Sequence, residues 1–307
     1  MGTPDIKLLE HKAARCRQKV VRMIRSGGAG HMGGAMSCLD IVTALYFRTM
    51  RHDPGLPGYA GRDRFILSAG HKCMALYAAL AEAGYFDESI LDTYGALNTK
   101  LPGHPDMHKL PGVEANTGAL GHGLSISVGM ALGLRMEGLA QNEDAYAGKK
   151  GSSRNKNASC PRVFTVLGDG ELPEGSNWEA ASAASHYKLD NLTAIIDWNG
   201  LQISGGVKDV MNMEPIGKKF TAFGWAQREI DGNNMEEVAR TLDALPFKKG
   251  KPSVIIARTV KAKGLPFAEG KAEYHYWKPK ADELHMAEQI LSTAERQAAD
   301  ALTGGGA

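Results

Sequence analysis

The chain has 307 residues, enough for one large hydrophobic core or two modest ones. Its net charge of +2 gives no electrostatic case for binding nucleic acid or a membrane surface, and 43% hydrophobic with 23% charged residues is typical of a soluble globular protein. No apolar run reaches the roughly 18 residues of a membrane helix, and the charged N-terminal stretch is unlike a signal peptide. Four scattered cysteines without a CxxC pair indicate reduced thiols, so we expect a cytoplasmic protein.

The first predicted element is a helix over residues 5–26, in which apolar residues recur at intervals of three and four. Glycines end it and open the stretch GGAGHMGG, which contains Gly28-x-Gly30-x-x-Gly33. That spacing is formally a dinucleotide fingerprint, but the fingerprint requires a preceding strand. A charged helix precedes this stretch instead, so we reject the fingerprint interpretation, and a nicotinamide oxidoreductase is the least favoured alternative.

A second helix is expected to begin at Ser37, with Asp40 three residues later as its capping-box partner. After a loop rich in proline and glycine, residues 65–67 predict a short strand that runs into the sequence SAGH and then an apolar helix. His71 therefore lies at the carboxyl end of a strand and at the amino end of a helix. This position suits the binding of a diphosphate group.

The stretch 101–124 reads LPGHPDMHKLPGVEANTGALGHGL. His104 and His108 have a spacing that would suit zinc ligands on one helix. Pro105 and Pro111 disfavour a helix through both histidines, so we discount a zinc site.

Two segments follow that carry no motif. Residues 125–139 predict a helix that packs on the sheet. Residues 142–159 are polar, basic and poor in apolar residues, so we interpret them as a solvated insertion loop. A phosphate-binding arm is the alternative interpretation.

The central pattern is a βαβ unit. Residues 163–167 and 192–196 are apolar runs that predict two strands, and residues 176–186 between them predict an alanine-rich helix. Two such strands lie parallel, joined by a right-handed crossover, and their carboxyl ends open on the edge of the sheet where ligands bind. Asp169 follows the first strand and Asn199 follows the second, so we expect both side chains at this edge.

These strand ends predict a site for a divalent cation and a diphosphate. Asp169, Asn199 and the Leu201 carbonyl, two residues further along extended chain, provide oxygen ligands for Mg²⁺, with Ca²⁺ as the alternative. Mg²⁺ usually completes its shell with water and phosphate oxygens. Gly168 and Gly170 would let the main chain approach a diphosphate without an intervening Cβ.

The C-terminal third continues the alternation of strands and helices. The predicted elements are a strand over 224–230, a helix over 235–245 capped by Asn234, a strand over 253–259 and a helix over 282–302. The sequence therefore predicts one α/β domain over residues 1–307, with a mostly parallel sheet and helices on both faces.

The GDG sequence with an asparagine about thirty residues later resembles the thiamine-diphosphate motif. The flanking sequences LSAGH, PGHP, LPGVE and TGALGHGLS resemble the transketolase family in particular, over most of the chain. The resemblance implies the thiamine-diphosphate-binding fold, with this chain as its pyrophosphate domain. Three features depart from the family: Met32 where proline is usual, His122 where glutamine is commoner, and the sequence HYW at His275.

The resemblance also implies roles for individual residues. His31, His104 and His275 would exchange protons with sugar hydroxyls, because imidazoles titrate near neutral pH. The implied cofactor-binding residues are His71, Gly118, Ala119, Leu120, Gly168, Gly170, Glu171, Glu174, Asn199, Lys261 and His275. The implied metal ligands are Asp169, Asn199 and Leu201.

Two of the acidic residues have a structural alternative. Glu171 can be a loop acid without contact to a cofactor. Glu174 can be a carboxylate that interacts favourably with a helix amino end. The resemblance instead implies that Glu174 belongs to an acidic network that links two cofactors across a subunit interface.

The implied reaction is the reversible transfer of a two-carbon ketol unit from a ketose phosphate to an aldose phosphate, using thiamine diphosphate and Mg²⁺. The chain matches only the first of the three domains of full-length members. We therefore expect the N-terminal subunit of a split transketolase, active with a C-terminal subunit that carries the pyrimidine-binding and C-terminal domains, in an α₂β₂ assembly. An exposed apolar surface should then exist for this partner.

Three alternatives stay open. The first is a split enzyme dedicated to an unusual sugar, such as a sulfonated or branched ketose. The second is another thiamine enzyme, against which the PGHP and TGALGHG sequences argue. The third is a non-catalytic subunit derived from the enzyme, against which the intact Asp169, Asn199 and histidine set argues.

Overall fold

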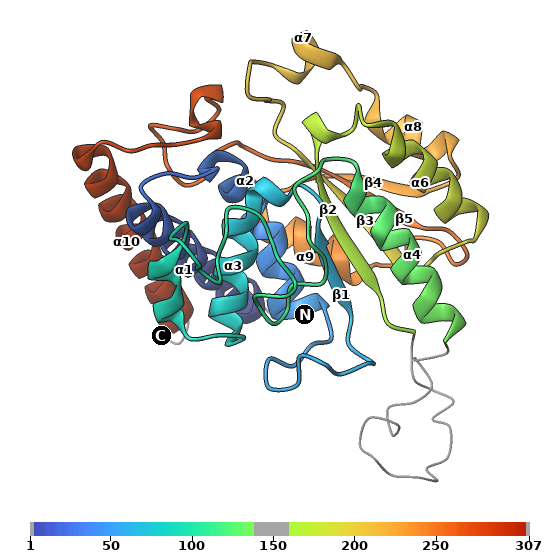
Figure 1. Ribbon diagram of the computed structural model, residues 1–307, viewed down its shortest axis with the longest axis horizontal. Coiled ribbons are helices and arrows are strands. Elements are labelled where there is room, and N and C mark those ends of the chain that lie inside the picture. Colours follow the sequence, from blue (N-terminus) through green and yellow to red (C-terminus); the bar gives the residue numbers. More distant parts are fainter. Residues whose placement is uncertain (1–2, 138–159, 305–307) are drawn as a thin grey trace.

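The computed structural model describes residues 3–137 and 160–304, so the predicted insertion 142–159 lies outside the described residues. At its centre, five parallel strands form one sheet in the order β1-β2-β3-β5-β4 (Figure 1). The strands are β1 Arg64–Leu67, β2 Val163–Gly168, β3 Leu192–Trp198, β4 Ala226–Asp231 and β5 Ser253–Arg258. The predicted parallel α/β architecture is confirmed.

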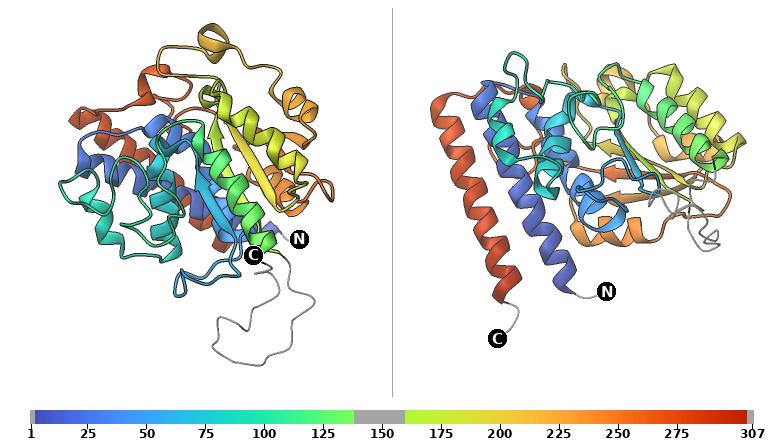
Figure 2. Two further views of the ribbon diagram at one scale, coloured as in Figure 1. Left: turned by 45° about the vertical axis from the view of Figure 1, so that its right-hand side comes forward. Right: turned by 60° about the horizontal axis from the view of Figure 1, so that its bottom comes forward.

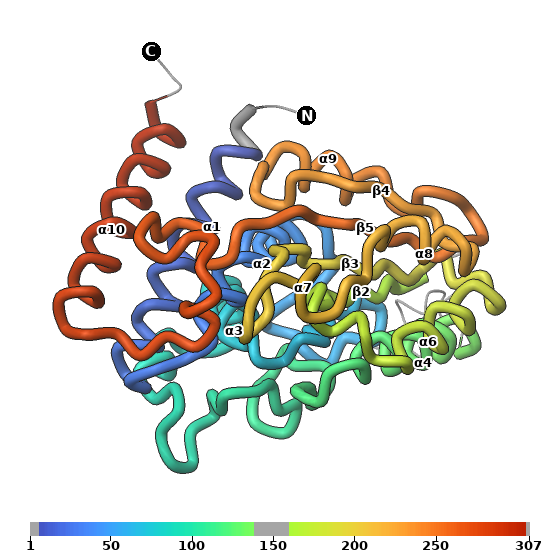
Figure 3. Tube along the Cα trace, turned by 90° about the horizontal axis from the view of Figure 1, so that it is seen from above, coloured from blue at the N-terminus to red at the C-terminus, as the bar shows by residue number. Residues whose placement is uncertain are grey.

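Helices bury both faces of β1, β2, β3 and β5, which explains why these strands lack an alternation of polar and apolar residues, whereas the edge strand β4 is largely exposed. Successive side chains of β2 point to opposite faces: Phe164 and Val166 join one core, whereas Val163 and Leu167 join the other. The helices on the first face are α2 Met32–Ala44, α3 Cys73–Ala83 and α9 Met235–Asp243, and those on the second are α4 His122–Met136, α6 Gly175–His186 and α8 Ile216–Ala222 (Figures 1 and 3).

Two long helices form an outer pair beyond the first face. α1 Thr3–Gly27 packs on α2 and α3, and α10 Ala281–Thr303 lies alongside α1 (Figure 2). Leu291 of α10 is buried in this contact, and His11 of α1 lies 2.8 Å from Glu295 of α10. None of the helices in the described parts of the chain combines the length and the apolar character required to cross a membrane.

The start of α2 differs from the prediction. The helix begins at Met32, five residues before Ser37, and Ser37 is fully buried inside it. Asp40 does not cap the helix: its carboxylate accepts hydrogen bonds from Arg17 at 2.7 Å and from Asn233 at 2.9 Å. The capping pattern was misleading because the whole of α2 is buried, so tertiary packing rather than local capping sets where it begins. Similarly, α4 begins at His122 rather than at Ser125.

The strands end together at one edge of the sheet. The register pairs Gly168, the last residue of β2, with Asp197 near the end of β3. Short 3₁₀ turns follow two of the strands, η2 Gly70–Lys72 after β1 and η5 Asp169–Glu171 after β2. The other short elements are η1 Leu45–Thr49, η3 Glu88–Thr93, α7 Val207–Met211 and η6 Ala272–His275.

Candidate active site

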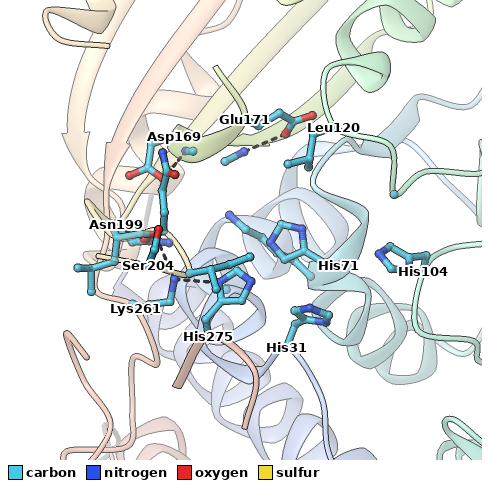
Figure 4. A pocket seen from close by; sticks show the side chains of 18 residues that line it. His31, His71, His104, Leu120, Asp169, Glu171, Asn199, Ser204, Lys261 and His275 are labelled. Carbon is cyan, nitrogen blue, oxygen red and sulfur yellow. Dashed lines mark hydrogen bonds between the residues drawn. The ribbon is translucent and has the colours of Figure 1, made fainter. Parts of the chain in front are cut away.

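A cavity of about 350 Å³ opens at the carboxyl edge of the sheet (Figure 4). Thirteen of the predicted site residues line it: His31, His71, His104, Gly118, Leu120, Gly168, Asp169, Gly170, Glu171, Asn199, Leu201, Lys261 and His275. Ala119 and Glu174 are exposed and are not among the lining residues. The carboxyl ends of β2 and β3 and the loops around them thus converge on one space, as expected for an open parallel sheet.

Four imidazoles form a cluster on one side of the cavity. They come from separate segments: His31 precedes α2, His71 lies in η2, His104 lies in the loop after η3, and His275 ends η6. The ring centroid of His31 lies 5.3 Å from that of His71, 5.3 Å from that of His275 and 6.3 Å from that of His104 (Figure 4). The rings are close enough to contact one small ligand together.

Burial keeps three of these imidazoles neutral. It lowers the pKa of His71 to about 2, with the Lys72 charge acting in the same direction, and it lowers the pKa of His275 to about 4, with help from Lys261. The pKa of His31 is also lowered, chiefly by burial. Within the described residues, the rings of His31, His71 and His104 make no hydrogen bond, so their nitrogens are available to a ligand.

Two of the predicted metal ligands, Asp169 and Asn199, lie on the side of the cavity away from His31 and His104 (Figure 4), and the third, Leu201, is hydrogen-bonded to Asn199. Asp169 accepts hydrogen bonds from the backbone N–H groups of Gly170, at 2.8 Å, and Gly200, at 2.6 Å. The Asn199 side-chain oxygen accepts one from Leu201 N–H at 3.1 Å, and its amide nitrogen donates to Ser37. These bonds hold the oxygens in fixed places. Burial raises the pKa of Asp169 to about 6, against the lowering effect of the Lys72 charge.

Lys261 projects from the chain after β5 into this group. Its side chain is 2% exposed, and its ammonium donates to the Leu201 carbonyl at 3.1 Å and to His275 Nδ1 at 3.2 Å. No described carboxylate lies within ion-pair distance of it. Burial, together with the Lys72 charge, lowers its pKa to about 8. An ammonium buried without an anion is costly, so this position favours an anionic ligand.

The sequence did not reveal a second buried lysine. Lys72 forms an ion pair with Asp197 at 2.5 Å, and Asp197 also accepts hydrogen bonds from Ser37 and Thr259. Burial would lower the pKa of Lys72, but the neighbouring Asp197 carboxylate raises it well above the ordinary value. Lys72 follows the predicted site residue His71, and Asp197 lies two residues before Asn199. Sequence alone nevertheless gives no signal that distinguishes a buried lysine from an exposed one.

Glu171 lines the cavity and is itself buried. Its carboxylate accepts hydrogen bonds from Ser68, from Gly121 N–H at 2.9 Å and from Gly168 N–H at 3.2 Å. Burial raises the pKa of Glu171, which these bonds partly offset. The residue thus ties the loop before α4 to the end of β2. This bonding supports the loop-acid alternative.

The Gly118–Gly121 loop depends on its glycines. Gly118 has φ +145, and a Cβ there would lie 2.7 Å from the His104 ring. A Cβ on Gly70 would come within 2.6 Å of Gly118 N. The loop therefore lies against η2 at backbone contact distance, which no larger residue permits. Its Leu120 side chain faces the cavity (Figure 4).

Comparison with known proteins identifies the family of this chain. The family model for the transketolase, thiamine diphosphate binding domain matches residues 10–298. A relative from Actinobacillus succinogenes, named as one subunit of an apulose-4-phosphate transketolase, is 45% identical over 284 residues, which are 92% of this chain and 95% of the relative. Another from Clostridium sp., named as one subunit of a 6-deoxy-6-sulfo-D-fructose transketolase, is 40% identical over 88% of this chain and 91% of its own length.

Longer relatives match over part of their length. Human transketolase is 37% identical over 286 residues, which are 93% of this chain and 42% of the human protein. The solved structure of transketolase from Leishmania mexicana superimposes with a TM-score of 0.80 at 25% identity, covering 96% of this chain and 46% of that one. This chain therefore spans less than half of these longer transketolases, but nearly all of the relatives named as subunits. The chain belongs to the transketolase family, as its N-terminal, thiamine-diphosphate-binding part.

Proposed function

We propose that this chain binds thiamine diphosphate and Mg²⁺ and, with a separate C-terminal subunit, transfers a two-carbon ketol unit between sugar phosphates. The observation that carries the proposal is the buried Lys261 ammonium, which has no carboxylate partner among the described residues and lies beside Asp169, Asn199 and the histidine cluster. A diphosphate would supply the missing anion, and Asp169 would help to hold a divalent cation beside it.

The residues at this edge fit a diphosphate and a metal. Gly168 and Gly170 line the cavity and carry no side chain, and the imidazole of His71 in η2, just before α3, offers a donor. No group of three or more His, Cys, Asp or Glu in the described chain is placed to hold a metal. Asp169, Asn199 and the Leu201 carbonyl would therefore need phosphate oxygens to complete a shell, which is the usual state of protein-bound Mg²⁺.

In this proposal, the histidines contact the sugar substrate. When bound, thiamine diphosphate supplies the electron sink that allows a bond between two sugar carbons to break. We assign His31, His104 and His275 to orienting hydroxyl groups and exchanging their protons, because their rings lie around the space next to the diphosphate position. His71, the most buried of the four histidines, would hold the diphosphate. Glu174 and Ala119 would act, if at all, outside the cavity.

A partner protein is part of the proposal. The hydrophobic Ile203 lines the cavity and yet is 75% exposed. Exposed apolar side chains at a site entrance favour a covering protein surface. We propose that this partner is the C-terminal transketolase subunit, in an α₂β₂ assembly in the cytoplasm. The four cysteines are free thiols, in keeping with a reducing compartment.

A second candidate concerns the sugar. The relatives at 45% and 40% identity carry names that specify apulose-4-phosphate and 6-deoxy-6-sulfo-D-fructose. The alternative is therefore an enzyme dedicated to a branched or sulfonated ketose as its donor. A non-catalytic subunit is disfavoured because Asp169, Asn199, Lys261 and the histidines are assembled around one cavity.

The test measures donor consumption and aldehyde transfer by this chain, alone and mixed with a C-terminal transketolase subunit, in the presence of thiamine diphosphate and Mg²⁺. Pentulose phosphate, branched and sulfonated ketoses are compared as donors. We expect activity only in the mixture and its loss in Asp169→Asn. Asp282→Asn, an exposed acid at the start of α10, is the matched control and should keep full activity. If no donor gives activity and thiamine diphosphate does not raise the melting temperature, the proposed function is wrong and the chain is a non-catalytic subunit.

A further inference from the structure

One aromatic residue contacts the histidine cluster from outside the cavity. The ring of Tyr276 lies edge-on to His31, with centroids 4.9 Å apart and an interplanar angle of 74°. This is the shortest of the ring distances around His31, since those to His71, His275 and His104 are 5.3, 5.3 and 6.3 Å. Tyr276 is not among the residues that line the cavity, and its side chain is 55% exposed.

The backbone fixes Tyr276 in this position. Gly30 and Trp277 exchange two backbone hydrogen bonds, at 3.0 and 2.8 Å, which join the segment after η6 to the residue before His31. Tyr276 is extended (φ −123, ψ 106), so its side chain and that of Trp277 point to opposite sides. Trp277 is buried against Phe267, and Tyr276 is thereby directed over His31.

Packing alone holds the His31 ring. It makes no hydrogen bond to any described residue, so contacts with its neighbours decide its orientation. Three of those neighbours, His71, His104 and His275, line the cavity and are themselves assigned to ligands. Among the described aromatic rings in contact with His31, Tyr276 is the remaining one, and it is not assigned to a ligand. Edge-to-face aromatic contacts of this kind contribute about 0.5–1.5 kcal/mol beyond area burial.

We infer that Tyr276 is a positioning residue for His31: its ring sets the orientation of the imidazole and shields it from water. The phenol hydroxyl makes no hydrogen bond within the described chain, so the ring and not the hydroxyl carries this role. The catalytic consequence rests on the proposed function, in which His31 exchanges protons with the sugar. The positioning of His31 by Tyr276 does not depend on the proposed function, because it concerns contacts within this chain.

The surroundings set the direction of the expected change. The titratable groups that face His31 are His71, His104, His275, Tyr276 and Lys261. Burial is the main reason that the pKa of His31 is lowered, followed by the His104 and Lys261 charges. Removing the Tyr276 ring admits water and leaves those charges in place. The imidazole should then protonate more readily, at a pH closer to 6.5.

The first experiment uses the cofactor-free chain. Histidine ring signals are titrated by NMR in wild type, Tyr276→Phe and Tyr276→Ala, with His31→Asn identifying the His31 signal. We expect the His31 titration midpoint to rise in Tyr276→Ala and to stay unchanged in Tyr276→Phe. Tyr187→Ala is the matched control, because Tyr187 also lies edge-on to a histidine, His186, at 4.9 Å and is 49% exposed. It should leave His31 unchanged.

The second experiment uses the chain with its C-terminal partner. In Tyr276→Ala, kcat/KM should fall about 10-fold to 100-fold, with its acid limb moved to higher pH, because a misoriented or protonated His31 cannot accept a proton. Tyr276→Phe should stay within about threefold of wild type. Should Tyr276→Ala prove unstable, Tyr276→Gln removes the ring while keeping a side chain.

Two results would overturn the inference. One is an unchanged His31 titration in Tyr276→Ala, and the other is an equal loss of activity in Tyr276→Phe and Tyr276→Ala, which would assign the role to the hydroxyl. If His31 titrates as expected but no preparation transfers a ketol unit, the proposed function is wrong and the positioning of His31 still holds.

Discussion

The two buried lysines at the site show how the presence or absence of a carboxylate partner changes the pKa of an ammonium group. Lys72 faces the Asp197 carboxylate at 2.5 Å, and its pKa is raised. Lys261 is equally buried but has only a carbonyl and an imidazole as partners, and its pKa is lowered to about 8. Lys72 is thus a charge already neutralised by the protein, whereas Lys261 is available to an incoming anion.

Lys261→Met should weaken the binding of thiamine diphosphate about 10-fold to 100-fold, since a hydrogen bond to a charged group contributes about 1.5–3 kcal/mol. Isothermal titration calorimetry with Mg²⁺ present measures this. Lys263→Met is the control, because Lys263 lies two residues away, pairs with Glu269 at 3.7 Å and does not line the cavity. Equal affinities of the two variants would show that Lys261 does not bind the diphosphate.

The neutral histidines predict acid sensitivity of the cofactor-free chain. The folded pKa of His275 is about 4, below its ordinary value of 6.5, so the unfolded chain binds more protons between these values. The stability that this neutral imidazole contributes is fully present above pH 6.5 and is lost as the pH falls toward about 4. Urea unfolding at pH 7 and pH 5 should show a smaller loss in His275→Asn than in wild type.

The control for this pH effect is His285→Asn, an exposed position on α10. It should lose as much stability on acidification as wild type does. If His275→Asn also matches wild type, the imidazole of His275 is not held neutral by its surroundings.

At the scale of elements, the junction before α4 joins the site to the helix layer. Gly121 precedes α4 with φ +86, and a Cβ there would lie 2.6 Å from Glu174 Cβ. Gly121 N–H also donates to the buried Glu171. Both the conformation and the close approach require glycine, so this short segment holds α4 and α6 at their present spacing.

Gly121→Ala should therefore lower the free energy of unfolding by about 2 kcal/mol or more. Gly129→Ala is the matched control inside α4: its Cβ would meet nothing within 4 Å and its φ is helical, so it should raise stability by about 0.5–1 kcal/mol. Denaturant midpoints of the isolated chain measure both. A Gly121→Ala midpoint equal to that of wild type would contradict this account of the junction.

Across the whole molecule, one buried network joins the segments beneath the cavity. Asp197 at the end of β3 receives Lys72 from η2, Ser37 from α2 and Thr259 from the chain after β5. All four parts of the chain must be in place before the carboxylate is satisfied. The network therefore couples the assembly of the fold to the assembly of the site.

Lys72→Met should lower the free energy of unfolding by about 3–5 kcal/mol, because it leaves the Asp197 charge buried and unpaired. Adding Asp197→Asn should restore part of that loss, which a double-mutant cycle from urea unfolding measures. The pair of the exposed Lys208 and the half-buried Glu214, 3.4 Å apart, supplies the control: Lys208→Met should change stability by less than about 1 kcal/mol. Additive effects of the two buried substitutions would mean that the pair does not interact.

The sequence by itself determined the parallel α/β class, the order of the strands along the chain and the presence of Asp169 and Asn199 at neighbouring strand ends. These features are local: an apolar run, a turn and the next apolar run specify a βαβ unit without reference to the rest of the chain. The sequences around the glycines and histidines were specific enough to indicate the transketolase family.

Only the tertiary structure decided which polar residues are buried and which residues they contact. Ser37 was predicted to begin a helix but lies inside one, and Lys72, which no sequence motif singled out, pairs with the buried Asp197. Glu171 ties two loops together, and Tyr276 packs on His31 from a segment near the other end of the chain. Each of these facts depends on contacts between distant segments, and the period of a local pattern carries no information about them.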